Sequence, residues 1–305
     1  MAAARNANTS SLYIDCRCTL GEGITWWPER RALLWTDITE STLWVHGAGG
    51  TRRWSLPHRL GSMAPCASGR LLLGLAKGLF IADIDPAKGG GALAVERIVE
   101  VESDIPSTRI NDGRTDRSGN FVFGTMNEAE GHPAAGSFYQ FSPRSGLRRL
   151  DLPSVGIANS ICFSLDGKTM YFCDSPTRQI LRCRYDAASA RVTGVEPFAT
   201  LDDSDGQPDG SIVDADGCLW NAVWGAAAVR RYRADGRMDL EVAVPAKNPT
   251  CPVFGGAGLN ELFVTTARQE MTTEELERVP HAGGVYRAAI DGVRGLPDAI
   301  VPDVS

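Results

Sequence analysis

A short apolar strand motif recurs six times along the chain, and this repeat constrains the fold more than any other feature. Successive copies start about 37 to 50 residues apart. The copies are Leu34–Ile38, Leu71–Leu75, Phe121–Thr125, Met170–Asp174, Leu219–Val223 and Leu262–Thr266. A period of this length is what one four-stranded blade of a β-propeller needs. The repeat therefore predicts an all-β chain folded as a six-bladed β-propeller with four-stranded blades.

The segments between the copies fit the same architecture. Turn sequences that contain glycine precede most copies, namely Ser68-Gly69-Arg70, Ser118-Gly119-Asn120, Asp166-Gly167-Lys168 and Asp216-Gly217-Cys218. Strands with alternating apolar and charged residues follow, as in Gln179–Tyr185, which is typical of outer strands with one wet face. We expect one helix, at Thr272–Arg278, because Thr272 and Glu275 fit a capping box. An N-terminal strand around Leu12–Ile14 is expected to pair into the last blade and close the ring.

Composition limits the partners of such a fold. Residues 11–305 are expected to form a single propeller domain after a flexible N-terminus at residues 1–10. The net charge of -6, without a cluster of Lys and Arg, argues against a nucleic-acid partner. Apolar runs too short to span a bilayer and the lack of a secretory signal predict no membrane partner and a cytoplasmic location, as a monomer or weak dimer. The eight cysteines are scattered and are expected to be reduced and largely buried.

A set of polar residues occurs in phase with the repeat. Counting back about ten to twelve positions from each copy reaches the start of the innermost strand of a blade, beside the channel. The residues at this phase are Glu22, Ser62, Asn111, Asn159, Asp209 and Cys251. Four of the six carry a carboxylate or amide oxygen, and the rotation that relates the blades brings residues of equal phase together around the axis. Such a set favours one divalent metal ion, Ca²⁺, Mg²⁺ or Mn²⁺, with Fe²⁺ or Zn²⁺ as alternatives.

A purely structural interpretation competes with this one. Asn111-Asp112-Gly113 and Pro208-Asp209-Gly210 are common turn sequences, and either of them alone more often marks a turn than a ligand. The joint occurrence of the oxygen-bearing residues at one phase favours the metal site. Asp166 and Asp216 fall out of phase, and for them we expect a structural role.

The predicted site suits hydrolysis of an ester or lactone. A cation can polarise a carbonyl, and Asp209 is the better candidate for the base that activates water, since Glu22 is expected to bind the metal. Arg109 lies two residues before Asn111 and so on the same side of an extended strand, where it can reach a ligand, although a surface arginine is an equal alternative. His132, in the loop at residues 127–135, either closes over the ligand or, as is more common, is a solvated loop histidine. Covalent catalysis is disfavoured, because no G-x-S-x-G motif occurs and the histidines lack triad spacing.

These motifs together resemble one family. The segments that carry the resemblance are Leu20-Gly21-Glu22-Gly23, Arg109-Ile110-Asn111-Asp112-Gly113, Gly124-Thr125-Met126, Asp166–Phe172, Pro208-Asp209-Gly210, Thr266-Ala267-Arg268 and Ala282-Gly283-Gly284. The sequence resembles the regucalcin, gluconolactonase and sugar-lactonase group, also called the senescence marker protein family. The resemblance runs through nearly the whole chain.

The resemblance implies roles for particular residues. One divalent cation would be held by Glu22, Asn159 and Asp209, with Asn111 near it, and Asp209 would also activate water. Arg109, Asn111 and Glu128 would contact the substrate, with Ala129 in place of Glu128 if the alignment shifts by one residue. The family usually has glycine after the ligand asparagine, where this chain has Ser160.

Within the family, three segments resemble the bacterial enzymes of aldonolactone catabolism: Phe172–Ser175, Ala222–Gly225 and Pro249–Cys251. The implied reaction opens an arabinono-, xylono-, galactono- or glucono-lactone to the aldonic acid. Met126 and Trp224 either shape the sugar pocket or pack in the core. The alternatives are an organophosphate or aryl-ester hydrolase of the same fold and a non-catalytic calcium-binding propeller.

Overall fold

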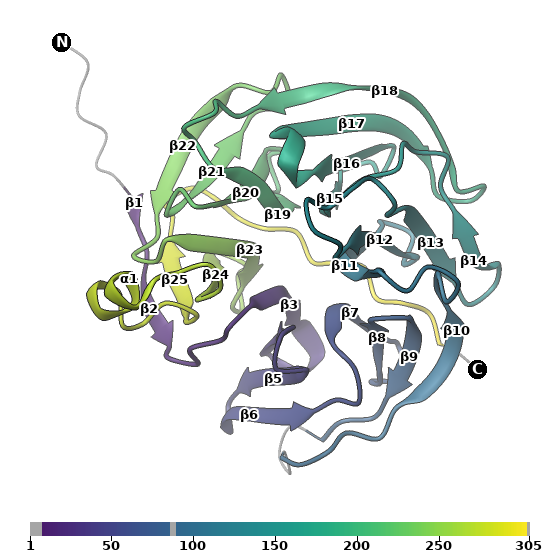
Figure 1. Cartoon of the computed structure of the whole chain (residues 1–305), viewed down its shortest axis with the longest axis horizontal. Helices are drawn as coiled ribbons and strands as arrows, with labels where there is room; N and C mark the ends of the chain where they lie inside the picture. Colours follow the sequence, from purple (N-terminus) through teal and green to yellow (C-terminus); the bar gives the residue numbers. More distant parts are fainter. Residues whose placement is uncertain (1–7, 86–89, 304–305) are drawn as a thin grey trace.

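The computed structural model, which describes residues 8–85 and 90–303, consists of six sheets arranged around a central channel (Figure 1). The first three blades are β3 (Gly21–Trp27), β4 (Ala32–Asp37), β5 (Thr42–Gly47) and β6 (Gly50–Ser55); β7 (Leu60–Pro65), β8 (Leu71–Leu75), β9 (Gly78–Ala82) and β10 (Glu96–Glu100); and β11 (Thr108–Thr115), β12 (Phe121–Asn127), β13 (Phe138–Ser142) and β14 (Gly146–Arg149). The next two are β15 (Ala158–Phe163), β16 (Thr169–Asp174), β17 (Gln179–Asp186) and β18 (Arg191–Thr200); and β19 (Gln207–Val213), β20 (Leu219–Trp224), β21 (Ala228–Tyr232) and β22 (Met238–Ala243). The last contains β23 (Asn248–Gly255), β24 (Glu261–Ala267), β25 (Val285–Ala289) and β2 (Ser11–Ile14). The predicted six-bladed propeller is confirmed.

The N-terminal strand closes the ring as expected. β2 pairs antiparallel with β25, with Leu12 opposite Tyr286 and Ile14 opposite Val285, so the last blade is built from both ends of the chain. A second short strand, β1 (Asn8–Thr9), pairs parallel with β22 and adds a fifth strand to the fifth blade. Of the N-terminus expected to be flexible, residues 1–7 lie outside the described residues.

Each innermost strand carries an irregularity at the same place. β3, β7, β11, β15, β19 and β23 surround the channel and contact one another in order, with β23 against β3 to complete the circle. The pairing of every one of them with its neighbour in the blade shifts register near its start. Such a bulge leaves residues out of the ladder and re-aims their side chains. The bulges coincide with the phase at which the polar residues recur in the sequence.

Buried aspartates stabilise the hairpins at the other end of the innermost strands. Asp214 follows β19 directly and accepts hydrogen bonds from Asp216 N, Cys218 N, Trp220 Nε1 and Arg231 Nε at 2.8 to 3.0 Å. The glycine of this turn, Gly217, has a φ of +80°, which a residue with a side chain rarely adopts. Asp216 is largely exposed and pairs with Arg231, as suits the structural role expected for it.

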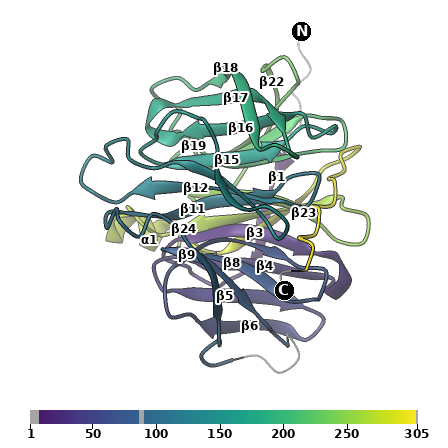
Figure 2. The same cartoon turned by 90° about the vertical axis from the view of Figure 1, so that its right-hand side faces the viewer.

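The C-terminal segment crosses the channel on this hairpin face. Gly295 forms a bridge with Asp214, and Val301 forms one with Cys66 on the far side of the ring. Between them, Asp298 lies 2.7 Å from the buried guanidinium of Arg114, which comes from β11. Figure 2 shows that this segment and the helix α1 (Thr273–Arg278) lie on opposite faces of the ring. The open end of the channel is therefore the one on the side of α1.

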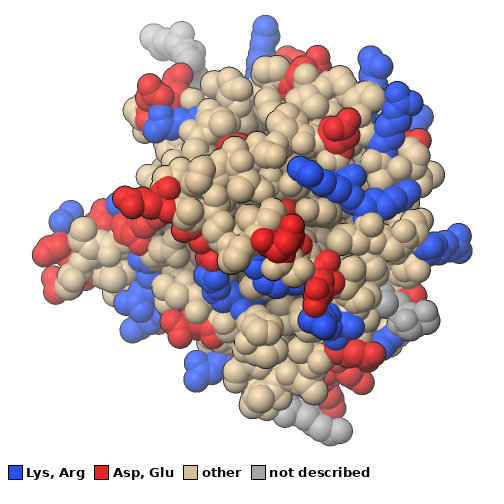
Figure 3. All heavy atoms as spheres, turned by 45° about the vertical axis from the view of Figure 1, so that its right-hand side comes forward, with Lys and Arg blue, Asp and Glu red and all other residues tan. Residues whose placement is uncertain are grey.

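The remaining elements follow local sequence signals. α1 begins after Thr272, whose side chain accepts a hydrogen bond from Glu275 N, while the Glu275 carboxylate accepts one from Thr272 N, so the predicted capping box is confirmed. All eight cysteines are free and only Cys16 is not buried, as expected. None of the helices in the described residues has the length and hydropathy needed to cross a membrane. On the face shown in Figure 3, side chains of both charge signs are distributed.

Candidate active site

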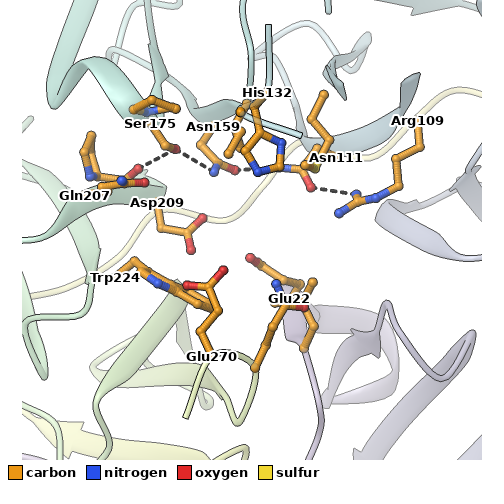
Figure 4. Close-up of a pocket in the computed structure, with 17 residues that line it drawn as sticks. Glu22, Arg109, Asn111, His132, Asn159, Ser175, Gln207, Asp209, Trp224 and Glu270 are labelled. Carbon is orange, nitrogen blue, oxygen red and sulfur yellow. Dashed lines mark hydrogen bonds between the residues drawn. The ribbon is translucent and has the colours of Figure 1, made fainter. Parts of the chain in front are cut away.

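A cavity of about 380 Å³ with a mixed polar and apolar lining opens at the end of the channel on the α1 face (Figure 4). Its walls come from the starts of the innermost strands and from the loops that follow the second strand of several blades. The lining residues are Leu20, Glu22, Arg109, Asn111, Met126, Gly131, His132, Ile157, Asn159, Ser175, Pro176, Gln207, Pro208, Asp209, Trp224, Gln269 and Glu270. A cavity of this size suits a small molecule.

Five residues that the sequence singled out meet in this cavity. Glu22, Arg109, Asn111, Asn159 and Asp209 all line it, although they come from four different blades. Each lies in an innermost strand, at or beside its bulge, and not in a turn. The turn interpretation of the Asn-Asp-Gly and Pro-Asp-Gly sequences is therefore wrong. The other two residues at this phase, Ser62 and Cys251, are buried outside the cavity lining.

The surroundings of the two carboxyl groups of the site, Glu22 and Asp209, disfavour their ionised forms. Burial, followed by the charges of Glu22 and Asp112, raises the pKa of Asp209 well above its usual value. Burial and the charge of Asp112 raise the pKa of Glu22 to about 8. Oδ1 of Asp209 is buried and has no hydrogen-bond partner among the described residues. An unpartnered buried oxygen costs free energy, so a cation or hydrogen-bond donor that binds to this oxygen would stabilise the site.

These residues fit a hard divalent cation. The described residues contain no group of three or more His, Cys, Asp and Glu side chains arranged to hold a metal ion, so a cation here needs an amide oxygen beside the two carboxylates. Asn159 supplies one, because its Oδ1 accepts a single hydrogen bond, from Asn111 Nδ2 at 3.0 Å, and an amide oxygen has two lone pairs. Figure 4 shows Glu22 and Asp209 directed toward each other across the cavity. A cation between two carboxylates also removes their mutual repulsion.

Arg109 also lines the cavity, and its side chain is held in place by Glu128. The Arg109 side chain is buried, donates to Asn111 Oδ1 at 2.7 Å and pairs with Glu128 through Nε at 3.1 Å. Glu128 does not line the cavity, and both of its oxygens lie 2.5 Å from the guanidinium of Arg59. Although burial acts to raise it, hydrogen bonds and charge from Arg59 and Arg109 lower the pKa of the Glu128 carboxyl. Glu128 therefore orients Arg109 as a charged partner.

Ser160, which stands where the family usually has glycine, adopts the backbone of a glycine. Its φ is +60°, close to the +57° of Gly23, which follows Glu22 at the same phase in the first blade. Its buried hydroxyl donates to the backbone oxygen of Asp209 at 2.6 Å, across to the next blade. This hydrogen bond offsets part of the strain of the left-handed conformation.

Sequence reasoning missed several residues of the cavity wall. Ser175 occupies the position after its repeated strand that Met126 and Trp224 occupy after theirs, so the same phase count would have found it. The side chains of Gln207, Gln269 and Glu270 also line the cavity and make no hydrogen bond to any residue that the structure describes. Gln207 lies two residues before Asp209, as Arg109 does before Asn111, so the same count would have found it, whereas no periodic signal marks Gln269 or Glu270.

His132 and the two large apolar candidates also lie on the cavity wall. The Nδ1 atom of His132 donates to the carbonyl of Asn127 at 2.7 Å, which leaves Nε2 as the acceptor of the neutral ring. Met126 and Trp224 both line the cavity, with Trp224 only partly buried. His132 thus lines the cavity from its loop while remaining partly exposed.

Comparison with known proteins agrees with this geometry. Residues 20–268 match the family model described as SMP-30/Gluconolactonase/LRE-like region. The chain is 48% identical to the L-arabinolactonase of Azospirillum brasilense over 92% of each protein, and 31% identical to the regucalcin of Gallus gallus over 94% of this chain and 98% of that one. Among solved structures, a calcium-binding protein, regucalcin, from Agrobacterium tumefaciens superposes with a TM-score of 0.88 at 33% identity, covering 96% of this chain and 97% of that chain.

The match spans every blade and includes the strands that carry Glu22, Asn159 and Asp209. The lactonases of this group are carboxylic ester hydrolases, and the expected resemblance is confirmed. This chain belongs to the SMP-30/gluconolactonase/LRE-like family, the group of sugar lactonases and regucalcins.

Proposed function

We propose that the chain hydrolyses sugar aldono-lactones to aldonic acids with the help of one divalent cation held by Glu22, Asn159 and Asp209. The observation that carries the proposal is the buried, unpartnered Oδ1 of Asp209 in a cavity that a second carboxylate and an amide oxygen share. The 48% identity to an L-arabinolactonase supports a pentonolactone as the first substrate to test. The cavity, of about 380 Å³, has room for a small molecule such as a sugar lactone.

The residues of the cavity have different roles in ring opening. When bound, the cation polarises the lactone carbonyl and lowers the free energy of the charge that develops on its oxygen. Asp209 takes a proton from the attacking water through its free oxygen and returns it to the ring oxygen as the ring C–O bond breaks. Arg109 donates to the lactone from the opposite wall, held in place by Glu128. Asn111 uses its amide hydrogens on Ala158 O and Asn159 Oδ1, so toward substrate it acts as an acceptor.

The rim of the cavity suits a polyhydroxylated ligand. Gln207, Gln269 and Glu270 present donors and acceptors with no partner among the described residues, and His132, whose Nδ1 is bound to Asn127 O, adds its Nε2 atom. Sugar hydroxyls can both donate and accept, so they satisfy such a mixed rim better than an aryl group does. Met126 and Trp224 supply the apolar surface against which a sugar ring packs.

The test is a hydrolysis assay on purified protein stripped with a chelator and then supplied with Ca²⁺, Mg²⁺, Mn²⁺, Zn²⁺ or Fe²⁺. The panel contains pentono- and hexono-lactones, phenyl acetate and paraoxon, with acid release as the readout. We expect cation-dependent opening of one or more aldono-lactones. Turnover of phenyl acetate or paraoxon without lactone opening would replace the substrate class proposed above.

A non-catalytic calcium-binding propeller is the second candidate. The Agrobacterium tumefaciens regucalcin, described as a calcium-binding protein, favours it, because the same fold and 33% identity accompany that description. Calcium binding by calorimetry, with no lactone turnover under any of the five cations, would support this second function against the first.

A further inference from the structure

A chain of hydrogen bonds crosses three blades beneath the cavity, and all its donors point the same way. Arg109 Nη1 donates to Asn111 Oδ1 at 2.7 Å, and Asn111 Nδ2 donates to Asn159 Oδ1 at 3.0 Å. Asn159 Nδ2 then donates to Ser175 Oγ at 2.9 Å, and Ser175 Oγ donates to Pro208 O at 2.8 Å. Dashed lines in Figure 4 follow this chain from Arg109 to Ser175 and beyond.

The groups at both ends of this series of hydrogen bonds fix its direction. A guanidinium can only donate, so the atom of Asn111 that faces Arg109 is the amide oxygen. A backbone carbonyl can only accept, so the Ser175 hydroxyl gives its proton to Pro208 and is left as an acceptor for Asn159. The amide of Asn159 therefore has one satisfied orientation, with nitrogen toward Ser175 and oxygen toward Asn111 and the cavity.

Burial makes this orientation depend on the hydroxyl. Ser175 is 3% exposed and Asn159 is 5% exposed, so water reaches neither group freely. Ser175 is itself held by the fold, because it begins the short helix Ser175–Thr177 and its N–H donates to Ile157 O at 3.0 Å. Without the hydroxyl, Asn159 Nδ2 has no acceptor in this position, and the amide keeps only the hydrogen bond from Asn111 Nδ2 to distinguish its two ends.

We propose that Ser175 is a positioning residue that keeps the amide oxygen of Asn159, and not its NH₂ group, turned toward the bound cation. This inference rests on the proposed function, because it takes Asn159 as a ligand of that cation. An amide rotated by half a turn would present two N–H donors to a positive charge. Partners that orient a metal ligand in this way typically change metal affinity by about 10- to 100-fold when removed.

The experiment measures binding of Ca²⁺ and of Mn²⁺ to the metal-stripped full chain by titration calorimetry, without substrate. We expect Ser175→Ala to weaken binding by about 10- to 100-fold. Ser175→Thr, which keeps the hydroxyl, should restore most of the affinity. Thr177→Ala is the matched control, because the Thr177 hydroxyl lies on the same short helix, is exposed and donates only to Asp174 O.

Each possible outcome either supports or contradicts the role proposed for Ser175. Wild-type affinity in a folded Ser175→Ala protein would overturn the inference, as would equal weakening in Ser175→Ala and Thr177→Ala, which would assign the effect to the helix and not to the hydroxyl. If Ser175→Ala does not fold, Ser175→Cys, whose thiol is a weak acceptor, takes its place and should show the same loss. If the wild-type chain binds neither cation, the titration is repeated with Mg²⁺, Zn²⁺ and Fe²⁺, and a chain that binds none of the five would instead contradict the proposed function.

Discussion

Two aspartates at opposite ends of the same strand have opposite surroundings. Asp214, just after the end of β19, is fully buried and its carboxylate accepts four hydrogen bonds. Asp209, near the start of β19, is 5% exposed, and its Oδ1 has no partner among the described residues. Both lie beside an Asp-Gly or Asp-x-Asp-Gly sequence of the kind found in turns. The difference shows that burial alone does not mark a functional carboxylate, whereas a buried, unpartnered oxygen on the wall of a cavity makes Asp209 a candidate for binding a ligand.

The largest effect should come from Asp209→Asn. The amide cannot take a proton from water, so we expect kcat for lactone opening to fall by about 10²- to 10⁴-fold. The fold should be kept, because Asp209 contributes its backbone oxygen, and not its free Oδ1, to the hydrogen bonds with Ser160 and Asn221. Activity assays and a thermal melt by circular dichroism check both points. A variant that unfolds would contradict this expectation, because Asp209 would then stabilise the fold as Asp214 does.

Asp214→Ala should do the reverse. It leaves the buried indole N–H of Trp220 and two backbone N–H groups without this acceptor and removes one carboxylate partner of the partly buried Arg231, so we expect a loss of about 3–5 kcal/mol in the free energy of unfolding. The activity of the molecules that remain folded should stay near that of the wild type. Urea denaturation measures the loss. Asp216→Ala is the control from the same hairpin, where an exposed ion pair predicts a change below about 1 kcal/mol.

Cation binding should stabilise the cavity end of the molecule through Asp209 and Glu22. With the cation at about 100 times its Kd, binding to the folded state alone adds about 2.7 kcal/mol and raises Tm. Differential scanning calorimetry with and without chelator measures this shift. Glu22→Gln should reduce the rise, while Asp216→Ala should leave it unchanged. An equal rise in Glu22→Gln and wild type would place the cation elsewhere.

Glu128 sharpens the comparison, because it lies near the cavity yet both of its oxygens are paired. If paired carboxylates act by holding other groups in place, Glu128→Gln should act through Arg109. We expect it to raise KM by about tenfold, which is the effect of one charge-assisted hydrogen bond, and to lower kcat by less. Steady-state kinetics separates the two constants. A loss confined to kcat would show instead that Glu128 takes part in the chemical step.

Much of the site could be predicted from the sequence because its residues recur with the repeat. Glu22, Asn111, Asn159 and Asp209 were identified by phase, and all four line one cavity. Ser175 was missed because only the innermost strand was counted and not the end of the second strand. Glu270 and Gln269 could not be found in this way, since they lie in the connection between β24 and β25, which contains α1 and is longer than the corresponding connection in each of the other blades.

The sequence by itself determined the number of blades, the hairpins, the capped helix and the height at which the polar residues meet. These depend on alternation of apolar residues, turn chemistry and spacing, which act over a few neighbouring residues or repeat along the chain. Only the tertiary structure decided which buried oxygens are satisfied. Asn159 is bound by Asn111 across 48 positions, and Asp209 by Ser160 across 49, so the partners belong to different blades. Whether an aspartate stabilises a turn or stays free for a ligand depends on these distant partners, which come together only when the ring closes.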